Sequence, residues 1–343
     1  MSLTKISFEE SLATHVVNAG RCLGCGACTL VCPFNCLEYK DEKPSVVKEC
    51  PACGICARIC PQYEGDESKI ESLVFGRERK AEEEFGIYRR LVVARANDER
   101  IQQVCQDGGA VTALLSFALK EGLIDSAVVA GVNPEKPFSP RPELAFTMEE
   151  ILKSAGVKYS YSPNVLALNE VIRRKKSNVA FVGTPCQVRA IRKMQIADLK
   201  KCCNPLKFLV GLMCSECFTY QGLMTKHIHE KLGINLSDIR KINIKGKMLV
   251  STASEIRTIP LADIKQYARK SCSFCHDFSS ELADISAGGL GLDGWTFIVV
   301  RTDKGDELFS SAEKAGAIKT RSAHEEVNAL NLLRRLSVKK RQR

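Results

Sequence analysis

The sequence has few aromatic residues and no long apolar segment. Aromatic side chains make up 6% of the 343 residues, and they are not interleaved with basic residues as stacking on nucleic-acid bases requires. No stretch approaches the roughly 20 apolar residues that span a bilayer. Charged residues interrupt the first twenty positions, so they form no apolar core of a secretion signal. We therefore expect neither a nucleic-acid-binding protein nor an integral membrane or secreted one.

Cysteine, by contrast, is abundant. The chain has 17 cysteines, an odd number in tight groups, whereas hydrophobic (45%) and charged (26%) residues are at ordinary levels for a protein with its own apolar core. These features favour a cytoplasmic protein whose reduced thiols bind metal over a disulfide scaffold. The formal net charge of +10 indicates attraction to acidic cofactors, acidic subunits or an anionic membrane surface.

The strongest motif is a repeat near the start of the chain, "CLGCGACTLVCP" (22–33) and "CPACGICARICP" (50–61). In such runs the first three thiolates bind one cubane and the fourth binds the other cluster. The prediction is therefore one cluster on Cys22, Cys25, Cys28 and Cys60, and a second on Cys50, Cys53, Cys56 and Cys32. Zinc is the alternative metal, but four-cysteine zinc sites lack this doubled spacing. The pattern resembles the bacterial-type ferredoxin with two [4Fe-4S] clusters.

The rest of the chain divides by composition. Residues 1–65 form the ferredoxin-like domain, and the highly charged segment 66–90 is expected to be a solvated linker or a helix wrapping the next domain. Residues 91–320 alternate apolar strands with helices, which predicts an α/β domain with a largely parallel sheet. We expect strands at 91–96, 127–132, 178–183, 207–214 and 295–302, helices at 108–122 and from 184, a hairpin at 241–253, and a Lys-Gly turn after the last strand. The fold class is thus α/β with α+β elements.

The last segment, 321–343, is a basic helix or tail with six basic residues in its final ten. One interpretation is a solvated, frayed end. The other is an electrostatic contact with an acidic partner surface or with anionic lipid, hence possible peripheral membrane association.

Five further cysteines are spaced for chemistry: Cys186, Cys214, Cys217, Cys272 and Cys275. Cys186 is expected at a helix N-terminus, where the helix dipole favours thiolate. Two models compete, a four-cysteine zinc site on the two Cys-x-x-Cys pairs or a third iron–sulfur cluster that includes Cys186, and spacing does not separate them. The remaining thiols are interpreted as structural: Cys36, Cys105, Cys202 and Cys203.

Several segments resemble, in order, the β subunit family of coenzyme F420 hydrogenases and dehydrogenases. They are "CQDGGAVTALLSFALKEGLIDSAVV" (105–129), "AGVKYSYSPNVLAL" (155–168), "FVGTPCQVRAIRK" (181–193), "GLMC" (211–214), "CSFCHDFSSELADIS" (272–286) and "GWTFIVVRTDKG" (294–305). The resemblance covers roughly residues 89–310. It implies bound FAD, reaction with F420 and a third [4Fe-4S] cluster on Cys186, Cys214, Cys272 and Cys275. Cys217 is an addition here, which leaves the choice between Cys214 and Cys217 open.

The residues expected to hold FAD come from this resemblance and from glycines before helices or at strand ends. They are Asp107, Gly108, Gly109, Lys158, Tyr159, Ser160, Gly183, Thr184, Pro185, Gly288 and Gly289. Two basic runs are candidates for the acidic tail of F420, Arg173–Lys176 and the set Arg189, Arg192 and Lys193, although a solvated helix face is the favoured interpretation of each.

A ferredoxin module ahead of the large domain is similar to the electron-input subunit of archaeal F420H2 dehydrogenases. The expected activity is oxidation of F420H2 at FAD, followed by single-electron transfer through the clusters to a membrane-bound complex that reduces a quinone or methanophenazine. No protein side chain is assigned a catalytic role, since the cofactors carry hydride transfer. The alternatives are a soluble ferredoxin:F420 oxidoreductase, an F420-reducing hydrogenase β subunit, and a docking subunit that only transfers electrons.

Overall fold

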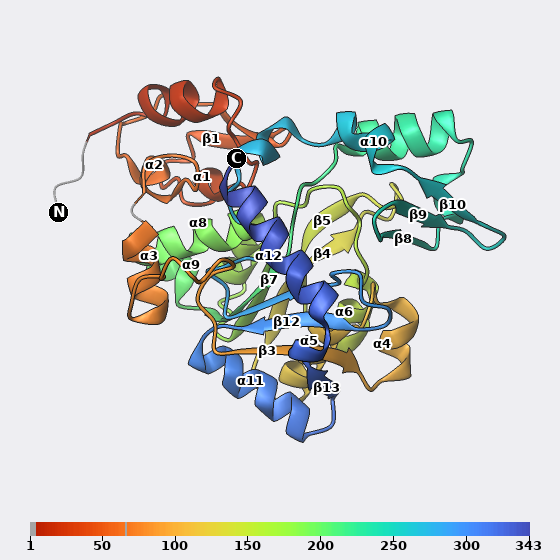
Figure 1. Cartoon of the computed structure of the whole chain (residues 1–343). Coiled ribbons are helices and arrows are strands. Elements are labelled where there is room, and N and C mark those ends of the chain that lie inside the picture. The colour runs from red at the N-terminus through yellow and green to blue at the C-terminus, as the bar shows by residue number, and fades with distance from the viewer. Residues whose placement is uncertain (1–4, 66) are drawn as a thin grey trace.

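An eight-stranded mixed sheet forms the centre of the molecule (Figure 1). The computed structural model describes residues 5–65 and 67–343. The strand order is β13-β3-β12-β11-β7-β6-β4-β5. In that order the strands are Ile318–Ser322, Arg90–Ala96, Thr296–Val300, Ile285–Gly288, Leu206–Leu212, Val179–Gly183, Ser126–Val132 and Pro140–Ala145.

The expected parallel sheet is correct for the centre and wrong for the flanks. Strands β4, β6, β7 and β11 are parallel neighbours, and β6 is buried at every position, as strands covered on both faces are. The pairs β4–β5, β11–β12, β12–β3 and β3–β13 are antiparallel. Only a short connection separates β11 from β12, whereas a parallel pair needs a crossover of a dozen residues or more.

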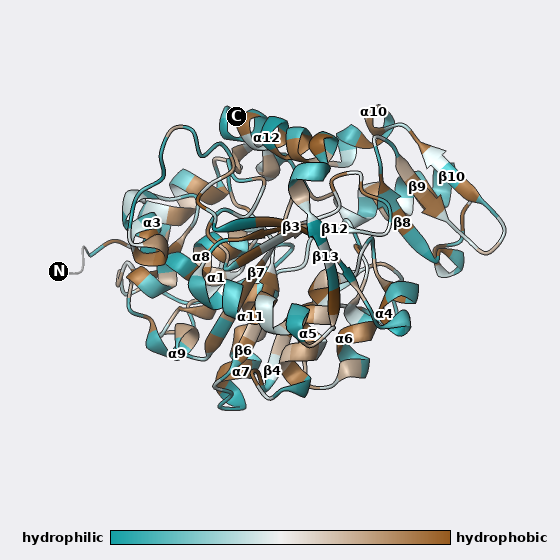
Figure 2. Ribbon diagram, turned by 60° about the horizontal axis from the view of Figure 1, so that its bottom comes forward, coloured by the Kyte–Doolittle hydropathy of each residue, from teal (hydrophilic) through white to brown (hydrophobic). Residues whose placement is uncertain are grey.

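Helices cover both faces of the sheet, and apolar residues (brown) concentrate on its strands in Figure 2. One face packs against α4 (Glu99–Val104), α5 (Ala110–Lys120), α6 (Met148–Ser154) and α11 (Asp303–Lys314). The other packs against α7 (Leu168–Arg173), α8 (Pro185–Ile196) and α9 (Lys200–Cys203), and, over β3 and β12, against α12 (Val327–Arg341). The predicted Lys-Gly turn is wrong, because Lys304 and Gly305 lie in the first turn of α11, which Thr302 caps.

The cysteine-rich module packs against the α8 face of the sheet. It contains η1 (Glu9–Val17), α1 (Ala27–Leu30), the hairpin β1 (Leu37–Lys40) and β2 (Lys43–Val46), and α2 (Ile55–Ile59). Cys25, Ala27 and Ile59 share an apolar cluster with α8. Gly26 and Gly54 occupy equivalent places before α1 and α2 with φ of 76° and 67°, a left-handed conformation that glycine adopts without strain. The repeat therefore encodes two matching turns.

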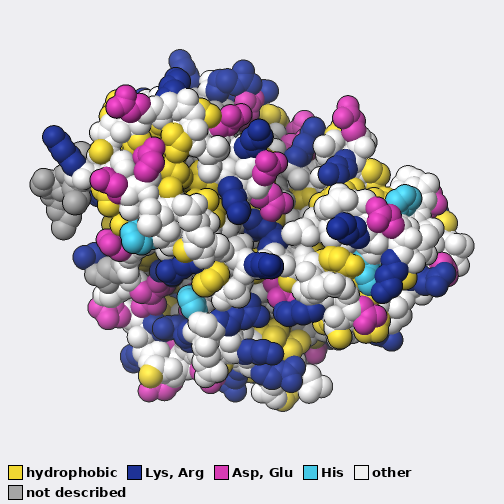
Figure 3. Space-filling view, turned by 90° about the horizontal axis from the view of Figure 1, so that it is seen from above, with side chains coloured by type: hydrophobic (Ala, Val, Ile, Leu, Met, Phe, Trp, Pro, Cys, Tyr) yellow, Lys and Arg dark blue, Asp and Glu magenta, His cyan; other side chains and the backbone are white. Residues whose placement is uncertain are grey.

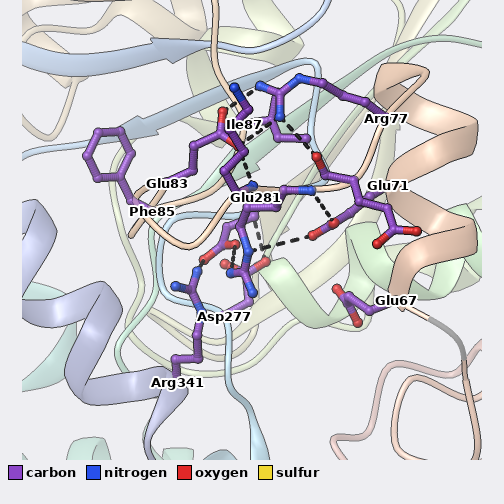
Figure 4. Close-up of polar contacts among 12 residues, drawn as sticks. Glu67, Glu71, Arg77, Glu83, Phe85, Ile87, Asp277, Glu281 and Arg341 are labelled. Carbon is purple, nitrogen blue, oxygen red and sulfur yellow. Dashed lines mark hydrogen bonds and ion pairs between the residues drawn. The ribbon is translucent and has the colours of Figure 1, made fainter.

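The described part of the charged segment, residues 67–90, is bound to the large domain rather than extended into solvent. Helix α3 (Glu67–Phe75) packs against α8. Beyond it, Arg77 pairs with Glu83 at 2.5 Å and Arg79 pairs with Glu281 at 3.2 Å, a network shown in Figure 4. The fully buried Arg301 donates a hydrogen bond to the carbonyl of Ile87 at 2.8 Å. The wrapping-helix interpretation of this segment is the one the structure supports.

A smaller three-stranded antiparallel sheet lies beside the main one. The expected hairpin is present as β8 (Lys241–Ile244) and β9 (Met248–Ser251), and a third strand, β10 (Ile256–Ile259), extends it. The remaining helices are η2 (Asn164–Ala167), η3 (Gln221–Lys231), η4 (Leu236–Asp238), α10 (Leu261–Ile264), η5 (Lys265–Tyr267), η6 (Lys270–Phe274) and η7 (Ala323–Glu325). In the described parts of the chain, no helix combines the length and apolarity needed to cross a bilayer.

Candidate functional site: three groups of thiols and a cavity

The first group of thiols lines one small cavity. Its lining includes Cys22, Cys25, Cys28 and Cys60, the four residues that the spacing assigns to one cluster. Burial, together with the like charges of Cys25, Cys60 and Cys22, raises the pKa of Cys28 well above its ordinary value. Because iron binds thiolate, loading this group must release protons.

The second group brings the other repeat together with the last cysteine of the first. Burial and then the neighbouring thiols of Cys53, Cys50 and Cys32 raise the pKa of Cys56 to about 12. The backbone N–H of Phe8 donates to Cys50 Sγ at 3.4 Å, and that of Cys36 donates to Cys32 Sγ at 3.3 Å. Such N–H···S contacts would favour the reduced, more negative state of a cluster held by these thiols.

The third group contains the five cysteines whose spacing suggested metal binding in the large domain. Cys186, Cys217, Cys272 and Cys275 are buried in one cluster with Leu23 and Tyr161, and Cys214 packs against it. Cys186 is the second residue of α8, and Thr184 Oγ1 lies 3.2 Å from its sulfur. Cys272 lies in η6, and Cys275 follows that helix. Parallel neighbours β6 and β7 end at the same edge of the sheet, which brings Cys186 and Cys214 together.

The neighbouring thiols Cys214 and Cys217 differ in their tendency to ionise. Their sulfurs are 4.0 Å apart. A hydrogen bond from Cys217, aided by the charge of Lys340, lowers the pKa of Cys214 to about 6, whereas the same contact and burial raise the pKa of Cys217 well above its ordinary value. The ammonium of Lys340 also donates to the backbone carbonyl of Cys214, which places a positive charge beside this thiol, so Cys214 is the candidate ligand of the pair.

We expect the two serine substitutions to separate these thiols. Cys214→Ser removes the preferred ligand and with it most of the third cluster, whereas Cys217→Ser leaves the cluster in place. The measurement is iron and acid-labile sulfide per chain in the anaerobically purified protein. Retention of a full iron content by Cys214→Ser, with loss in Cys217→Ser, would reverse the assignment.

The three groups of thiols follow one another in space. Cys25 of the first group is close enough to Cys186 of the third for their charges to interact, and Cys56 of the second group interacts with Cys28 of the first. A cavity of about 210 Å³ between the module and the large domain is lined by residues of both, including Leu23, Pro61 and Cys186. The order in space is therefore third, first, second.

A larger cavity, of about 560 Å³, opens beside the third group of thiols. It lies at the carboxyl ends of β6 and β7, the edge of an open α/β sheet where ligands bind. Its volume is in the range of cofactor sites, and Cys214 and Cys217 line its wall. Two polar atoms in this wall, Ser160 Oγ and Gln187 Oε1, are buried without a hydrogen-bond partner among the described residues. Buried polar groups in native proteins are almost always paired, so these two atoms are suited to a polar ligand.

Eight of the eleven residues expected to hold the flavin line this cavity: Asp107, Gly109, Lys158, Tyr159, Ser160, Gly183, Thr184 and Gly288. The other three residues lie outside the lining of this cavity. A side chain on Gly108 would meet the carbonyl oxygen of Ala94 at 2.5 Å, one on Gly289 would meet Asp107 at 2.2 Å, and Pro185 lines the 210 Å³ cavity.

Lys158 supports the cavity wall rather than pointing a free charge into the cavity. Its ammonium donates to the carbonyls of Ala130, Ala155 and Gly156 at 3.1–3.2 Å, and also to that of Ser154. Burial lowers its pKa to about 8.

Neither basic run expected to receive the acidic tail of F420 reaches the cavity. Arg173 and Arg174 both pair with Glu170 at the end of α7, which leads into the amino end of β6, opposite the cavity. On α8, Arg189 pairs with Glu67 at 2.5 Å and Arg192 pairs with Asp284 at 2.9 Å. The four arginines of the two runs are thus paired with carboxylates of the protein, and the binding of the acidic tail of F420 by these runs stays a prediction.

The third member of that run, Lys193, fastens the cysteine-rich module to α8. It is buried, and its ammonium donates to the carbonyl of Cys60 at 2.6 Å, to that of Tyr63 at 2.8 Å and to that of Glu64. Cys60 belongs to the first group, so this contact fixes the position of that group against the large domain.

We expect Lys193→Met to loosen this junction, because the carbonyls of Cys60, Tyr63 and Glu64 lose a buried charged donor, and one hydrogen bond to a charged group contributes about 1.5–3 kcal/mol. Amide hydrogen exchange of residues 62–65 in the holoprotein should accelerate at least about tenfold, the equivalent of about 1.4 kcal/mol. Lys201→Met, at an exposed position of α9, is the control. Equal exchange in the two variants would show that Lys193 does not hold the module.

Sequence reasoning missed the polar network behind the cavity. Ser162 Oγ donates to Asn164 Oδ1 at 2.6 Å, Asn164 Nδ2 donates to the carbonyl of Val182 at 2.8 Å, and Gln187 Nε2 donates to the carbonyl of Ser162 at 2.5 Å. All three side chains line the cavity. Only the position of Gln187, one residue after Cys186, could have singled it out.

Fold and site together define an α/β protein in which a 4Fe-4S binding module is joined to a sheet domain with a deep cavity. The family model "4Fe-4S binding domain" matches residues 15–38. Two models of the "Coenzyme F420 hydrogenase/dehydrogenase, beta subunit", one for its N-terminal part and one for its C-terminal part, match residues 91–169 and 176–326. The chain belongs to this F420 hydrogenase/dehydrogenase β subunit family.

Relatives from methanogens agree with this assignment. The chain is 41% identical to the coenzyme F420 hydrogenase subunit beta of Methanothermobacter thermautotrophicus, over 76% of this chain and 93% of that protein. It is 31% identical to an F420H2 dehydrogenase subunit of Methanosarcina mazei, over 86% and 83%. A solved structure of the F420-reducing [NiFe] hydrogenase complex from Methanosarcina barkeri contains a chain with 37% identity and a TM-score of 0.72, over 76% of this chain and 91% of that one.

Proposed function

We propose that this protein is the electron-input subunit of an F420H2 dehydrogenase. It oxidises F420H2 at FAD bound in the 560 Å³ cavity and passes the electrons singly through three [4Fe-4S] clusters to a membrane-bound partner complex. The observation that carries the proposal is the shared wall, since Cys214 and Cys217 belong both to the third group of thiols and to the cavity lining. A ligand in that cavity is therefore in direct contact with the third metal site.

The cavity fits a flavin in chemistry as well as in size. Bound FAD accepts a hydride and releases its two electrons one at a time. The cavity wall offers apolar side chains such as Leu115, Val129 and Met213, which can pack on a ring. It also offers the two unpaired polar atoms of Ser160 and Gln187. The protein's contribution is to orient the ring, to exclude water and to hold the ring beside Cys214.

The third group suits an iron–sulfur cluster better than zinc. Among the residues that the structure describes, no three Cys, His, Asp or Glu side chains converge closely enough to hold one metal ion. Each thiolate of a cubane binds a different iron, so the four sulfurs stand farther apart than around a single ion. We assign Cys186, Cys214, Cys272 and Cys275 to this cluster.

The order of the three groups gives a single path. A cluster on the third group would receive electrons from the flavin, and a cluster on Cys22, Cys25, Cys28 and Cys60 would relay them. A cluster on Cys50, Cys53, Cys56 and Cys32 would pass them to the partner. The outer group is the most accessible, because Cys32, Cys50 and Cys53 are only half-buried, whereas Cys25 and Cys28 are buried. A partner protein or a ferredoxin would therefore dock at the outer group.

The similarity to the dehydrogenase subunit extends over more of this chain than the hydrogenase similarity does. This difference favours a dehydrogenase over a hydrogenase β subunit.

The test is anaerobic F420H2 oxidation by cofactor-complete protein with and without the organism's membranes. The proposal predicts that membranes stimulate turnover and that quinone analogues inhibit the stimulated part. Unstimulated turnover with ferredoxin as the sole productive acceptor would instead favour a soluble ferredoxin:F420 oxidoreductase.

A further inference from the structure

Two buried cations enclose the third group of thiols from different sides. Lys340 comes from the last turn of α12 and Arg269 from the residue before η6, and they are 3% and 8% exposed. Basic side chains are almost never this buried unless they are paired. What each of them contacts therefore indicates why it is there.

Lys340 is directed at the thiols. Its ammonium donates to the carbonyl of Cys214 at 2.5 Å, and its charge acts on Cys214, Cys275 and Cys186. Arg341 and Arg343 hold this end of the helix in place. Arg341 pairs with Glu281 at 2.5 Å (Figure 4), and Arg343 donates to the carbonyl of Cys272 at 3.4 Å.

Arg269 lies between the third group and the first. Its backbone N–H donates to the carbonyl of Cys217 at 2.8 Å, and its own carbonyl accepts from the N–H of Cys272 at 2.9 Å. Its guanidinium pairs with Glu42 at 2.8 Å, lies 4.2 Å from the centre of the Tyr161 ring and donates to the carbonyl of Leu23 at 2.9 Å. Because Leu23 follows Cys22, the charge also acts on the first group.

We propose that Lys340 and Arg269 are electrostatic positioning residues that raise the reduction potential of the third cluster, with Arg269 acting on the first cluster as well. This inference rests on the proposed function. Reduction adds one negative charge to a cubane, and a fixed cation nearby in a dry environment stabilises that charge. Net charge and hydrogen bonding around a cluster are among the factors that set its potential. Asp277 beside Cys275 opposes both cations, and Glu42, half exposed, offsets part of the charge of Arg269. Both carboxylates stay in place in the variants, so the loss of each cation is measured against the same background.

The consequence is a third cluster that accepts electrons readily from the adjacent flavin. A cluster with four thiolates in a buried site and no nearby cation would be hard to reduce, because burial disfavours added charge. The C-terminal helix thus contributes to electron entry although it holds no cofactor. Figure 3 views the molecule from the side on which Figure 1 marks the C-terminus, and it shows further Lys and Arg side chains there. These side chains are exposed, so salt screens their charges.

The test is a redox titration of the holoprotein followed by EPR, with mediators and dithionite and without F420. In Lys340→Gln the midpoint potential of one cluster should fall by about 59 mV, a tenfold change in the one-electron equilibrium, while the other two stay within error. Lys340→Arg should keep the wild-type value. The control is Lys339→Gln, the same loss of charge at the exposed neighbouring position, which should shift no cluster.

Arg269→Gln supplies an independent arm. In this variant the midpoint potentials of the third and the first cluster should both fall. Unchanged potentials in Lys340→Gln, or an equal shift of all three clusters in it, would overturn the proposal. Since no step uses F420, these results bear on the cations alone, whereas a wild-type protein with only two clusters would refute the proposed function as well.

Discussion

Cys272→Ser is expected to interrupt electron transfer between the flavin in the large domain and the clusters of the cysteine-rich module. Without this ligand the third cluster is lost, and iron falls from about twelve to about eight atoms per chain. Reduction of the remaining clusters by F420H2 should then slow by about 100-fold or more, since even changes outside the ligand shell of a metal site cost 10–100-fold. F420H2 should still bleach the flavin, because the cavity is formed by other residues. Iron analysis and anaerobic stopped-flow absorbance measure the two effects.

The matched control is Cys203→Ser. Cys203 is also buried, but it packs among the apolar residues of α8 and α9, away from the three groups. Its variant should keep about twelve irons and the wild-type rate of cluster reduction. An equally slow rate in both variants would mean that loss of stability, rather than loss of the third cluster, explains the effect of Cys272→Ser.

Ser160→Trp is expected to abolish flavin binding. Ser160 lies in the cavity wall, its hydroxyl is one of the two unpaired polar atoms, and an indole there would occupy much of the space available to a ring. Flavin content should fall below about one-tenth of wild type, corresponding to at least 1.4 kcal/mol of lost binding. F420H2 oxidation should fall with it, while the iron content remains about twelve.

The effect of this substitution is read against Ser254→Trp, which places the same indole in the exposed turn between β9 and β10. That variant should retain full flavin content and activity. If Ser160→Trp also bound a full equivalent of FAD, the flavin would have to lie outside this cavity.

Much of the fold and the grouping of the module's thiols could be predicted because the signals are local. Strand β6 is a short apolar run after a helix, and the doubled cysteine spacing fixes which thiols of the module come together. Gly26 and Gly54 fit turns that their sequence positions alone suggest. The third group was harder, because Cys186, Cys214 and Cys272 come from three distant segments. Spacing left zinc and a cluster open there, and family resemblance rather than geometry supplied the choice.

The remaining features depend on tertiary contacts that a sequence does not display. For the basic helix or tail at the end of the chain, the sequence left a solvated end and an electrostatic contact open, and it did not indicate that α12 buries Lys340 beside Cys214. The charges of α8 suggested an anion site, yet Glu67 and Asp284 neutralise them. In both cases the partner lies far away in sequence, so composition could not distinguish a paired cation from a free one. The antiparallel flanks of the sheet likewise follow from connection lengths rather than from strand composition.

The most direct test of the account is an anaerobic titration of the cofactor-complete protein with F420H2, followed by absorbance and EPR in the same samples. The account predicts about twelve irons and one FAD per chain, bleaching of the flavin, and the appearance of reduced [4Fe-4S] signals as F420H2 is added. Flavin that bleaches without any reduced-cluster signal, or a chain with about eight irons and one zinc, would contradict it.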